Sequence, residues 1–347
     1  MKGIFFIPIN KPSTPYSEVL NSIIDETIFC DNNSISEAFF GEHMADKYEK
    51  VSSSLTFISS LAKLTKKIKL GTMTSNIIFF HPAVLSSIIS SVDNLCGGRL
   101  QLGIGCGSNQ CDLELINKLD NNNHKIMLEM IDLVMKILKS KDLIDIKTKN
   151  FSISSKKKGS KKLLLGYFDG LYKNRKNLEI ILPILSKKSY NLKICKEKKW
   201  SFLSSNFCSE SIIKSHISNY NSKVSKENLS KMKIARFIFV TEKYSEVKKY
   251  LFAENSPYKY MINVIKKKME FYNRNDVFGL GTSDLNEIIN KLVIYGTPDI
   301  VSEKLSEFKN RVGDFGTLVY TSVPSFNKDI YKNSLKLFAN EVKFKKS

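Results

Sequence analysis

The sequence predicts an α/β fold, a (β/α)8 TIM barrel with insertion segments, formed by a single domain over residues 1–347. Short apolar runs typical of strands alternate with amphipathic helical patterns, which favours a parallel sheet covered by helices. Four such strand and helix pairs occupy about the first 140 residues, a spacing that suits a barrel of eight pairs. The apolar fraction of 42% is sufficient for one large core, although the length alone also allows two ordinary domains.

In the first half of the chain, each expected strand is followed by an expected helix. The strands are Lys2–Asn10, Ile35–His43, Lys67–Ile77 and Arg99–Gly107, and the helices are Ser17–Phe29, Ser54–Thr65, Ala83–Cys96 and Asn123–Leu138. The second half supplies four more strands, Ile180–Leu185, Trp200–Phe207, Ile234–Glu242 and Phe315–Val323. Two segments interrupt this alternation. We expect a lysine-rich excursion from the barrel at about 146–177 and a variable, partly helical segment at about 258–286.

The formal net charge of +20 raises the question of a nucleic-acid partner, because clustered lysines and arginines bind phosphate backbones. The lysines, however, are spread along the whole chain instead of forming one basic face. The two dense runs, Ser154–Lys162 and Ile265–Phe271, are typical of a solvated loop and of the polar face of a helix. We therefore expect no nucleic-acid partner.

The sequence also predicts a cytoplasmic protein. It lacks an opening stretch of the signal-peptide type, and no run approaches the roughly 18 apolar residues of a membrane span. We therefore expect no membrane partner. The six cysteines have no CxxC spacing, so reduced thiols are expected at Cys30, Cys96, Cys106, Cys111, Cys195 and Cys208.

Polar groups gather where the expected strands end. Glu42 and His43 close the second strand, and Thr72–Asn76 continue the third. A glycine-rich turn, Gly105–Gly107, follows the fourth strand, and Lys187–Ser189 follow the fifth. Because the carboxyl ends of barrel strands meet at one rim, this set suits a bound anion beside an acid–base group.

The glycine-rich turn does not complete a dinucleotide fingerprint. Gly103 and Gly105 occupy its first two positions, but Ser108 stands where the third glycine is needed. The pattern therefore predicts the end of a strand whose backbone a ligand can approach closely, with no nicotinamide site.

Several segments, in their order and spacing, resemble the bacterial luciferase family of flavin-dependent monooxygenases. The segments are Ala38–Met44 (AFFGEHM), Lys67–Pro82 (KIKLGTMTSNIIFFHP), Val92–Gly107 (VDNLCGGRLQLGIGCG), Tyr295–Phe308, Gly313–Tyr320 and Ser334–Val342. The resemblance covers nearly the full length and is weakest at the two interrupting segments. It implies a barrel that binds reduced FMN, which reacts with dioxygen to oxidise a small organic substrate. It also implies a homodimer and a separate flavin reductase that supplies the reduced FMN.

The resemblance assigns roles to individual residues. His43 falls on the family's catalytic histidine, where an imidazole can exchange protons near neutral pH, while Met44 replaces a second histidine. The strand beside the flavin ring corresponds to Met73, Thr74, Ser75 and Asn76, with a cis peptide bond expected between Met73 and Thr74.

The phosphate of FMN is expected at the ends of the fourth and fifth strands. Cys106 takes the place of an arginine that contacts the phosphate in luciferases, and a thiol cannot replace a guanidinium fork. Lys125 corresponds to a second phosphate-binding arginine, and Lys188 and Ser189 fall on the phosphate loop.

Other interpretations stay open. The same fold also serves enzymes that transfer hydride with a deazaflavin coenzyme, and the losses at Met44 and Cys106 are compatible with a non-catalytic flavin-binding relative. Cys106, Cys111 and His124 have no fourth ligand at a suitable spacing, so we expect no metal. His216 is expected on a helix surface, and Pro82 is expected to begin a helix.

Overall fold

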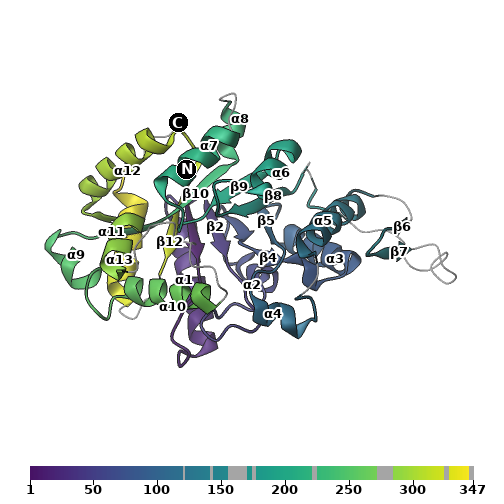
Figure 1. The fold of residues 1–347 in the computed structure, drawn as a ribbon, viewed down its shortest axis with the longest axis horizontal. Helices are drawn as coiled ribbons and strands as arrows, with labels where there is room; N and C mark the ends of the chain where they lie inside the picture. Colours follow the sequence, from purple (N-terminus) through teal and green to yellow (C-terminus); the bar gives the residue numbers. More distant parts are fainter. Residues whose placement is uncertain are drawn as a thin grey trace.

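The computed structural model describes residues 1–119, 122–140, 144–154, 170–173, 177–220, 225–271, 284–323 and 328–343. Within these residues, eight parallel strands close into a barrel in the order β1, β2, β3, β5, β8, β9, β10 and β12 (Figure 1). They span Lys2–Phe6, Glu37–Phe40, Lys69–Thr72, Leu100–Gly105, Glu179–Ile184, Ser201–Ser204, Met232–Val240 and Thr317–Ser322. Closure comes from β1 beside β12, where Gly3 pairs with Val319. The predicted (β/α)8 fold is confirmed.

Short strands extend the barrel. The strand β4 (Ser75–Asn76) continues β3 and pairs with the end of β5, and β11 (Val293–Gly296) pairs with the end of β10. Away from the barrel, β6 (Asp145–Lys147) and β7 (Ser152–Ser154) form an antiparallel hairpin. The predicted excursion therefore begins with a hairpin, and residues 155–169 and 174–176 lie outside the described residues.

Helices surround the strands (Figure 1). They are α1 (Tyr16–Asn32), α2 (Ser54–Leu61), α3 (Pro82–Leu95), α4 (Gln110–Leu115), α5 (Asn123–Lys139), α6 (Tyr190–Lys198), α7 (Glu210–Tyr220), α8 (Lys226–Ser230), α9 (Ser245–Tyr250), α10 (Pro257–Phe271), α11 (Leu285–Leu292), α12 (Pro298–Val312) and α13 (Lys328–Asn340), with a 3-10 turn η1 at Ile77–Phe79. In Figure 1, α4 and α10 lie at the lower edge, opposite the two chain ends. Among the described helices, none is long and apolar enough to cross a membrane.

The barrel interior is layered. A buried apolar layer consists of Phe39, Met73, Ile181, Leu203, Ala235 and Val319. Gly71 is required here, because a Cβ atom at this position would lie 2.5 Å from Cδ1 of Phe39. Below this layer, towards the strand N-termini, Lys233 lies between the carboxylates of Glu37 and Glu179. The apolar layer therefore separates two ends of the barrel. We call the end where the strands begin the lower end, and the end where they finish the upper rim, which is turned towards the lower edge of Figure 1.

Two expectations about helices can be compared with the structure. The segment 258–286 opens with the regular helix α10, which contains the lysine run at residues 265–271 as predicted, while residues 272–283 lie outside the described residues. Pro82 begins α3, and His81 caps it by accepting a hydrogen bond from the Ala83 amide at 3.3 Å.

The prediction for His216 is wrong. Its side chain is fully buried, with Nδ1 3.0 Å from the Ser204 hydroxyl and Nε2 2.9 Å from the Ser186 carbonyl oxygen. Ile213 and Ile217 are buried as well, so this face of α7 packs against the barrel instead of solvent. The helical periodicity identified the helix but not which of its faces is covered.

Candidate functional site

His43 lies at the upper rim, directly after β2. Its backbone amide donates to the Val51 carbonyl oxygen at 3.0 Å, which fixes the start of the side chain. The imidazole Nδ1 is 3.1 Å from Oδ2 of Asp112 and 3.2 Å from Nδ2 of Asn109. Nε2 is 3.5 Å from Oε2 of Glu49. The ring is therefore oriented from both sides by polar groups.

Asp112 is itself held firmly. Its side chain is buried in the first turn of α4, and its Oδ1 accepts a hydrogen bond from the Ala45 amide at 2.7 Å. Asn109 caps the same helix by accepting from the Cys111 amide at 3.0 Å. The short helix α4 thus positions both partners of the imidazole.

The charges around His43 favour its protonated form. Burial by itself lowers the pKa of an imidazole, but the carboxylates of Glu49 and Asp112 outweigh burial and raise the pKa of His43 to about 9. At neutral pH the ring is therefore an imidazolium, able to act as an acid.

Glu42 has an organising role beside His43. Its buried carboxylate accepts hydrogen bonds from the Ser54 amide at 2.7 Å and the Ser54 hydroxyl at 2.6 Å. The other carboxylate oxygen accepts from the Asn76 amide at 2.8 Å. One side chain thereby ties the end of β2 to the start of α2 and to β4.

The strand after β3 has the features expected of it. The peptide bond between Met73 and Thr74 is cis, as predicted. Met73 faces the barrel interior, and the Met73 amide donates to the Phe40 carbonyl oxygen at 2.7 Å. Ser75 is buried, and its hydroxyl has no hydrogen-bond partner within the described residues. Asn76 is also buried. These residues thus lead from the end of β3, which pairs with β2, into β4, which pairs with the end of β5.

Gly103 and Gly105 are explained by strand packing. A Cβ atom at Gly103 would lie 2.0 Å from the Thr72 carbonyl oxygen, and one at Gly105 would lie 2.3 Å from Oγ1 of Thr74. Both glycines thus let β5 approach the segment that contains the cis bond. The group that approaches both glycines in the structure is a neighbouring strand, and the expected approach of a ligand stays a prediction.

Cys106 follows β5 and is half-buried. Burial raises the pKa of its thiol, so the group is neutral and offers no charge to a phosphate. Gly107, next along the chain, has φ +75°, and a Cβ atom there would lie 2.8 Å from Cδ2 of Leu113.

The remaining predicted residues form a second group. Lys125 is exposed in the first turn of α5, and Lys188 and Ser189 directly precede α6. The two helix starts are joined because Nε2 of His124 lies 2.7 Å from Oδ1 of Asn191. The structure thus brings Lys125 and the Lys188–Ser189 turn to one part of the rim.

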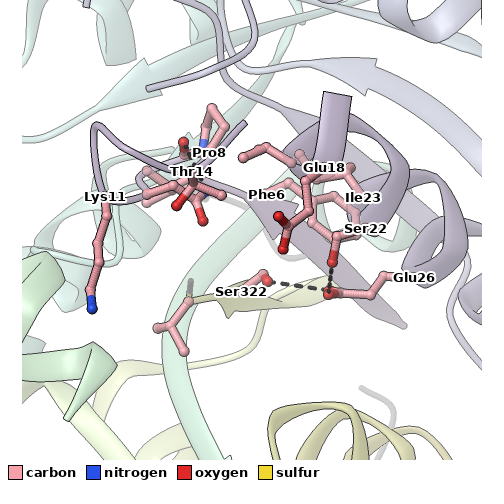
Figure 2. A pocket seen from close by; sticks show the side chains of 13 residues that line it. Phe6, Pro8, Lys11, Thr14, Glu18, Ser22, Ile23, Glu26 and Ser322 are labelled. Carbon is pink, nitrogen blue, oxygen red and sulfur yellow. Dashed lines mark hydrogen bonds between the residues drawn. The ribbon is translucent and has the colours of Figure 1, made fainter. Parts of the chain in front are cut away.

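Several cavities open around the rim. A cleft of about 460 Å³ lies between residues 45–48, α4 and α10. A second recess of about 390 Å³ contains His43 and the exposed side chain of Met44. A third cavity of about 290 Å³ lies behind the rim, between α1 and the ends of β1 and β12 (Figure 2). There Glu26 accepts hydrogen bonds from Ser22 and Ser322 at 3.4 and 3.5 Å.

Sequence reasoning did not find four of the groups around His43, namely Glu49, Asn109, Asp112 and Lys268. Asn109 and Asp112 carried a usable signal, since they follow a glycine-rich turn at a strand end. Lys268 carried none, because it is one of many lysines and lies 219 residues from Glu49.

The described geometry defines a (β/α)8-barrel protein with a histidine-centred site at the C-terminal rim. Residues 1–157 match the family model of the luciferase-like monooxygenases. The chain is 23% identical to 2,5-diketocamphane 1,2-monooxygenase 1 of Pseudomonas putida in an alignment 363 positions long. The alignment covers 98% of this chain and 97% of that protein. A shorter match, 31% identical over 125 residues, covers 36% of this chain and 36% of a Sinorhizobium fredii protein. These matches agree with the resemblance that the motifs indicate, over the first 157 residues for the family model and over nearly the full length for the Pseudomonas putida relative.

Solved structures share the fold. The oxygenating constituent of 3,6-diketocamphane monooxygenase from Pseudomonas putida, in complex with FMN, superposes with a TM-score of 0.86 at 19% identity, over 98% of this chain and 97% of that one. An F420-dependent secondary alcohol dehydrogenase, in complex with an F420-acetone adduct, gives a TM-score of 0.65 at 13% identity, over 96% and 98% of the two chains.

Proposed function

We propose that this protein is a monooxygenase that uses reduced FMN and dioxygen to oxidise a small organic substrate. The observation that carries the proposal is the imidazole of His43, which follows β2 at the rim and is held there by the buried carboxylate of Asp112. The names of the full-length relative and of the FMN-bound structure support the same assignment.

The residues at the rim fit a flavin. Oγ of Ser75 and Nδ2 of Asn206 are buried without a hydrogen-bond partner in the part of the chain that the structure describes. Buried polar atoms are normally paired, so a polar ligand at the barrel mouth would satisfy them. Lys125 and Lys188 supply positive charge for a phosphate, and they lie beside the N-terminus of α6, where the Ser189 side chain makes no capping hydrogen bond. Cys106 takes the place of the arginine that contacts the phosphate in luciferases, and its neutral thiol adds no charge to this site.

When bound, reduced FMN would supply the electrons that activate dioxygen. His43 would manage the protons. Asp112 holds its Nδ1, which leaves Nε2 as the atom that exchanges a proton with the reacting groups. Since the pKa of His43 is raised to about 9, this proton is present at neutral pH. The apolar layer around Met73 would limit the access of water from below.

A second candidate is hydride transfer with a deazaflavin coenzyme, which needs no dioxygen. The structural similarity to the F420-dependent dehydrogenase favours this candidate, although at 13% identity it is a similarity of fold alone. A non-catalytic flavin-binding relative is the third candidate. The mass and absorption spectrum of the copurified cofactor distinguish the first two, because FMN and a deazaflavin absorb at different wavelengths. For the FMN enzyme we further propose a homodimer and a separate flavin reductase as partner.

Phosphate recognition is tested by comparing FMN with riboflavin. Charge-assisted hydrogen bonds contribute about 1.5 to 3 kcal/mol, so Lys188→Ala should weaken FMN binding roughly ten-fold or more and leave riboflavin binding nearly unchanged. Isothermal titration calorimetry with each ligand measures both affinities. Lys193→Ala is the matched control, since Lys193 lies on α6, the helix that follows Lys188, and is 69% exposed beside Glu197. Equal losses for FMN and riboflavin would contradict the assignment.

A further inference from the structure

His43 lies in a charged cluster that three segments build together. Glu49 and Asp46 come from the segment after β2, Asp112 comes from α4, and Lys268 comes from α10. Lys268 forms ion pairs with Oδ2 of Asp46 and, at 2.8 Å, with Oε1 of Glu49. The cluster therefore contains three carboxylates, one ammonium group and one imidazole.

Glu49 connects the two basic groups. Its Oε1 faces the ammonium of Lys268, and its Oε2 faces Nε2 of His43 at 3.5 Å. A carboxylate that is already paired with an ammonium group stabilises a nearby imidazolium less than an unpaired carboxylate does. The pairing with Lys268 thus limits how strongly Glu49 holds the proton on His43.

The cluster is sufficiently enclosed for these charges to matter. The side chain of Lys268 is 19% exposed, and those of Glu49 and Asp46 are 12% and 7% exposed. Interactions between partly buried charges are screened much less by salt than those between fully exposed charges. Tyr16, Lys47 and Lys50 line the recess that contains His43, and Lys50 donates to the backbone carbonyl oxygen of Pro12 at 2.8 Å.

We infer that Lys268 is a positioning residue that sets the acidity of His43 through Glu49. The inference rests on the proposed role of His43 as an acid, and it names the group that adjusts this acid to its task. Lys268 acts without touching the imidazole, since it neutralises the carboxylate that faces Nε2.

The direction of each effect follows from the charges. Lys268 lowers the pKa of His43 and Glu49 raises it, against a background of burial that lowers it. Removing the ammonium should therefore raise the pKa of the imidazole, and removing the carboxylate should lower it. Opposite shifts from two contacting residues are not expected of a purely structural pair.

The test measures the protonation of His43 directly, in the full chain without added flavin. Protein with isotope-labelled histidine is titrated by NMR, and the His43 signal among the four histidines is assigned by its loss in His43→Gln. We expect Lys268→Met to raise the midpoint of His43 by about half to one pH unit, and Glu49→Gln to lower it by about one unit. Lys267→Met, the neighbouring lysine on α10, should leave the midpoint unchanged.

Lys268→Arg keeps the charge and should retain the parent midpoint. An unchanged or lowered midpoint in Lys268→Met overturns the inference, as does an unchanged midpoint in Glu49→Gln. If Lys268→Met does not fold, as judged by circular dichroism, Lys268→Gln and Glu49→Gln decide the question by the same shifts. Because the titration needs no turnover, its failure is distinct from failure of the proposed monooxygenase activity, which a lack of oxygen-dependent turnover would reveal.

Discussion

The two ends of the barrel carry similar chemistry in different surroundings. At the lower end, Nζ of Lys233 lies 3.0 Å from Glu37 and 3.2 Å from Glu179, and the side chains of Lys233 and Glu37 are 1% exposed. At the upper end, His43 lies between Asp112 and Glu49 with 22% of its side chain exposed. Strands position the lower cluster, whereas the segment after β2 and two helices position the upper one.

This difference separates stability from reactivity. Burial lowers the pKa of Lys233, but the two carboxylates outweigh it and hold the pKa above its usual value, so the ammonium keeps its charge. A proton held in this way is not available for exchange with a substrate. The His43 proton, with a pKa of about 9 and access to a recess, is available. The lower end therefore maintains the barrel, and the upper end is where we propose the chemistry, as is usual for this fold.

The largest expected effect is on turnover at the upper end. His43→Ala should slow substrate oxidation by about a hundred-fold to ten-thousand-fold, the usual range for a positioned acid–base group. FMN binding should change little, because the proposed phosphate site lies at α5 and α6. Steady-state rates with reduced FMN, dioxygen and substrate, together with FMN affinity, check both statements. Unchanged turnover in this variant would show that His43 is not the acid–base group of the reaction.

The sequence predicts the residues of the upper end better than those of the lower end. The strands were predicted because apolar runs and turn residues are local signals, and the motif around Glu42 and His43 identified the upper rim. The lower ion pair was not predicted, because it joins Lys233 to Glu37 across 196 residues and only barrel closure brings them together. Lys268 was missed for the same physical reason. Its role depends on where α10 packs, which no local pattern records.

The second prediction concerns the lower end. Lys233→Met leaves two carboxylates buried without their ammonium partner, and removing one partner of a buried ion pair costs about 3 to 5 kcal/mol of stability. Denaturant unfolding followed by circular dichroism measures the loss. Lys69→Met is the matched control, because Lys69 approaches Glu37 and Glu179 at 3.9 Å but is 49% exposed, and exposed pairs contribute at most about 1 kcal/mol.

The comparison of the ends would fail if Lys233→Met cost no more stability than Lys69→Met. It would also fail if the folded fraction of Lys233→Met lost turnover to the extent expected for His43→Ala. Activity is therefore expressed per folded molecule, at a temperature where circular dichroism shows the variant to be native.

The smallest expected effect concerns Glu26, in the cavity behind the rim that Figure 2 shows. Burial raises the pKa of Glu26 to about 7, and Lys332, Ser22 and Ser322 offset it only in part. A carboxyl group ordinarily titrates near pH 4.3, so between about pH 4.5 and 7 the folded protein binds a proton that the unfolded chain releases. The stabilisation from this proton is complete below that range and is lost as the pH rises through it.

Glu26→Gln removes the ionisable group and should make the protein about 2 kcal/mol more stable than the parent at pH 8. Each pKa unit corresponds to about 1.4 kcal/mol, and the effect is reduced because the cavity admits some solvent. At pH 4.5 the two proteins should have nearly equal stability, so unfolding midpoints at both pH values provide an internal control. A stability difference that is the same at both pH values would show that Glu26 affects packing and not proton binding, and it would place the proton-exchanging chemistry of this barrel at the upper rim alone.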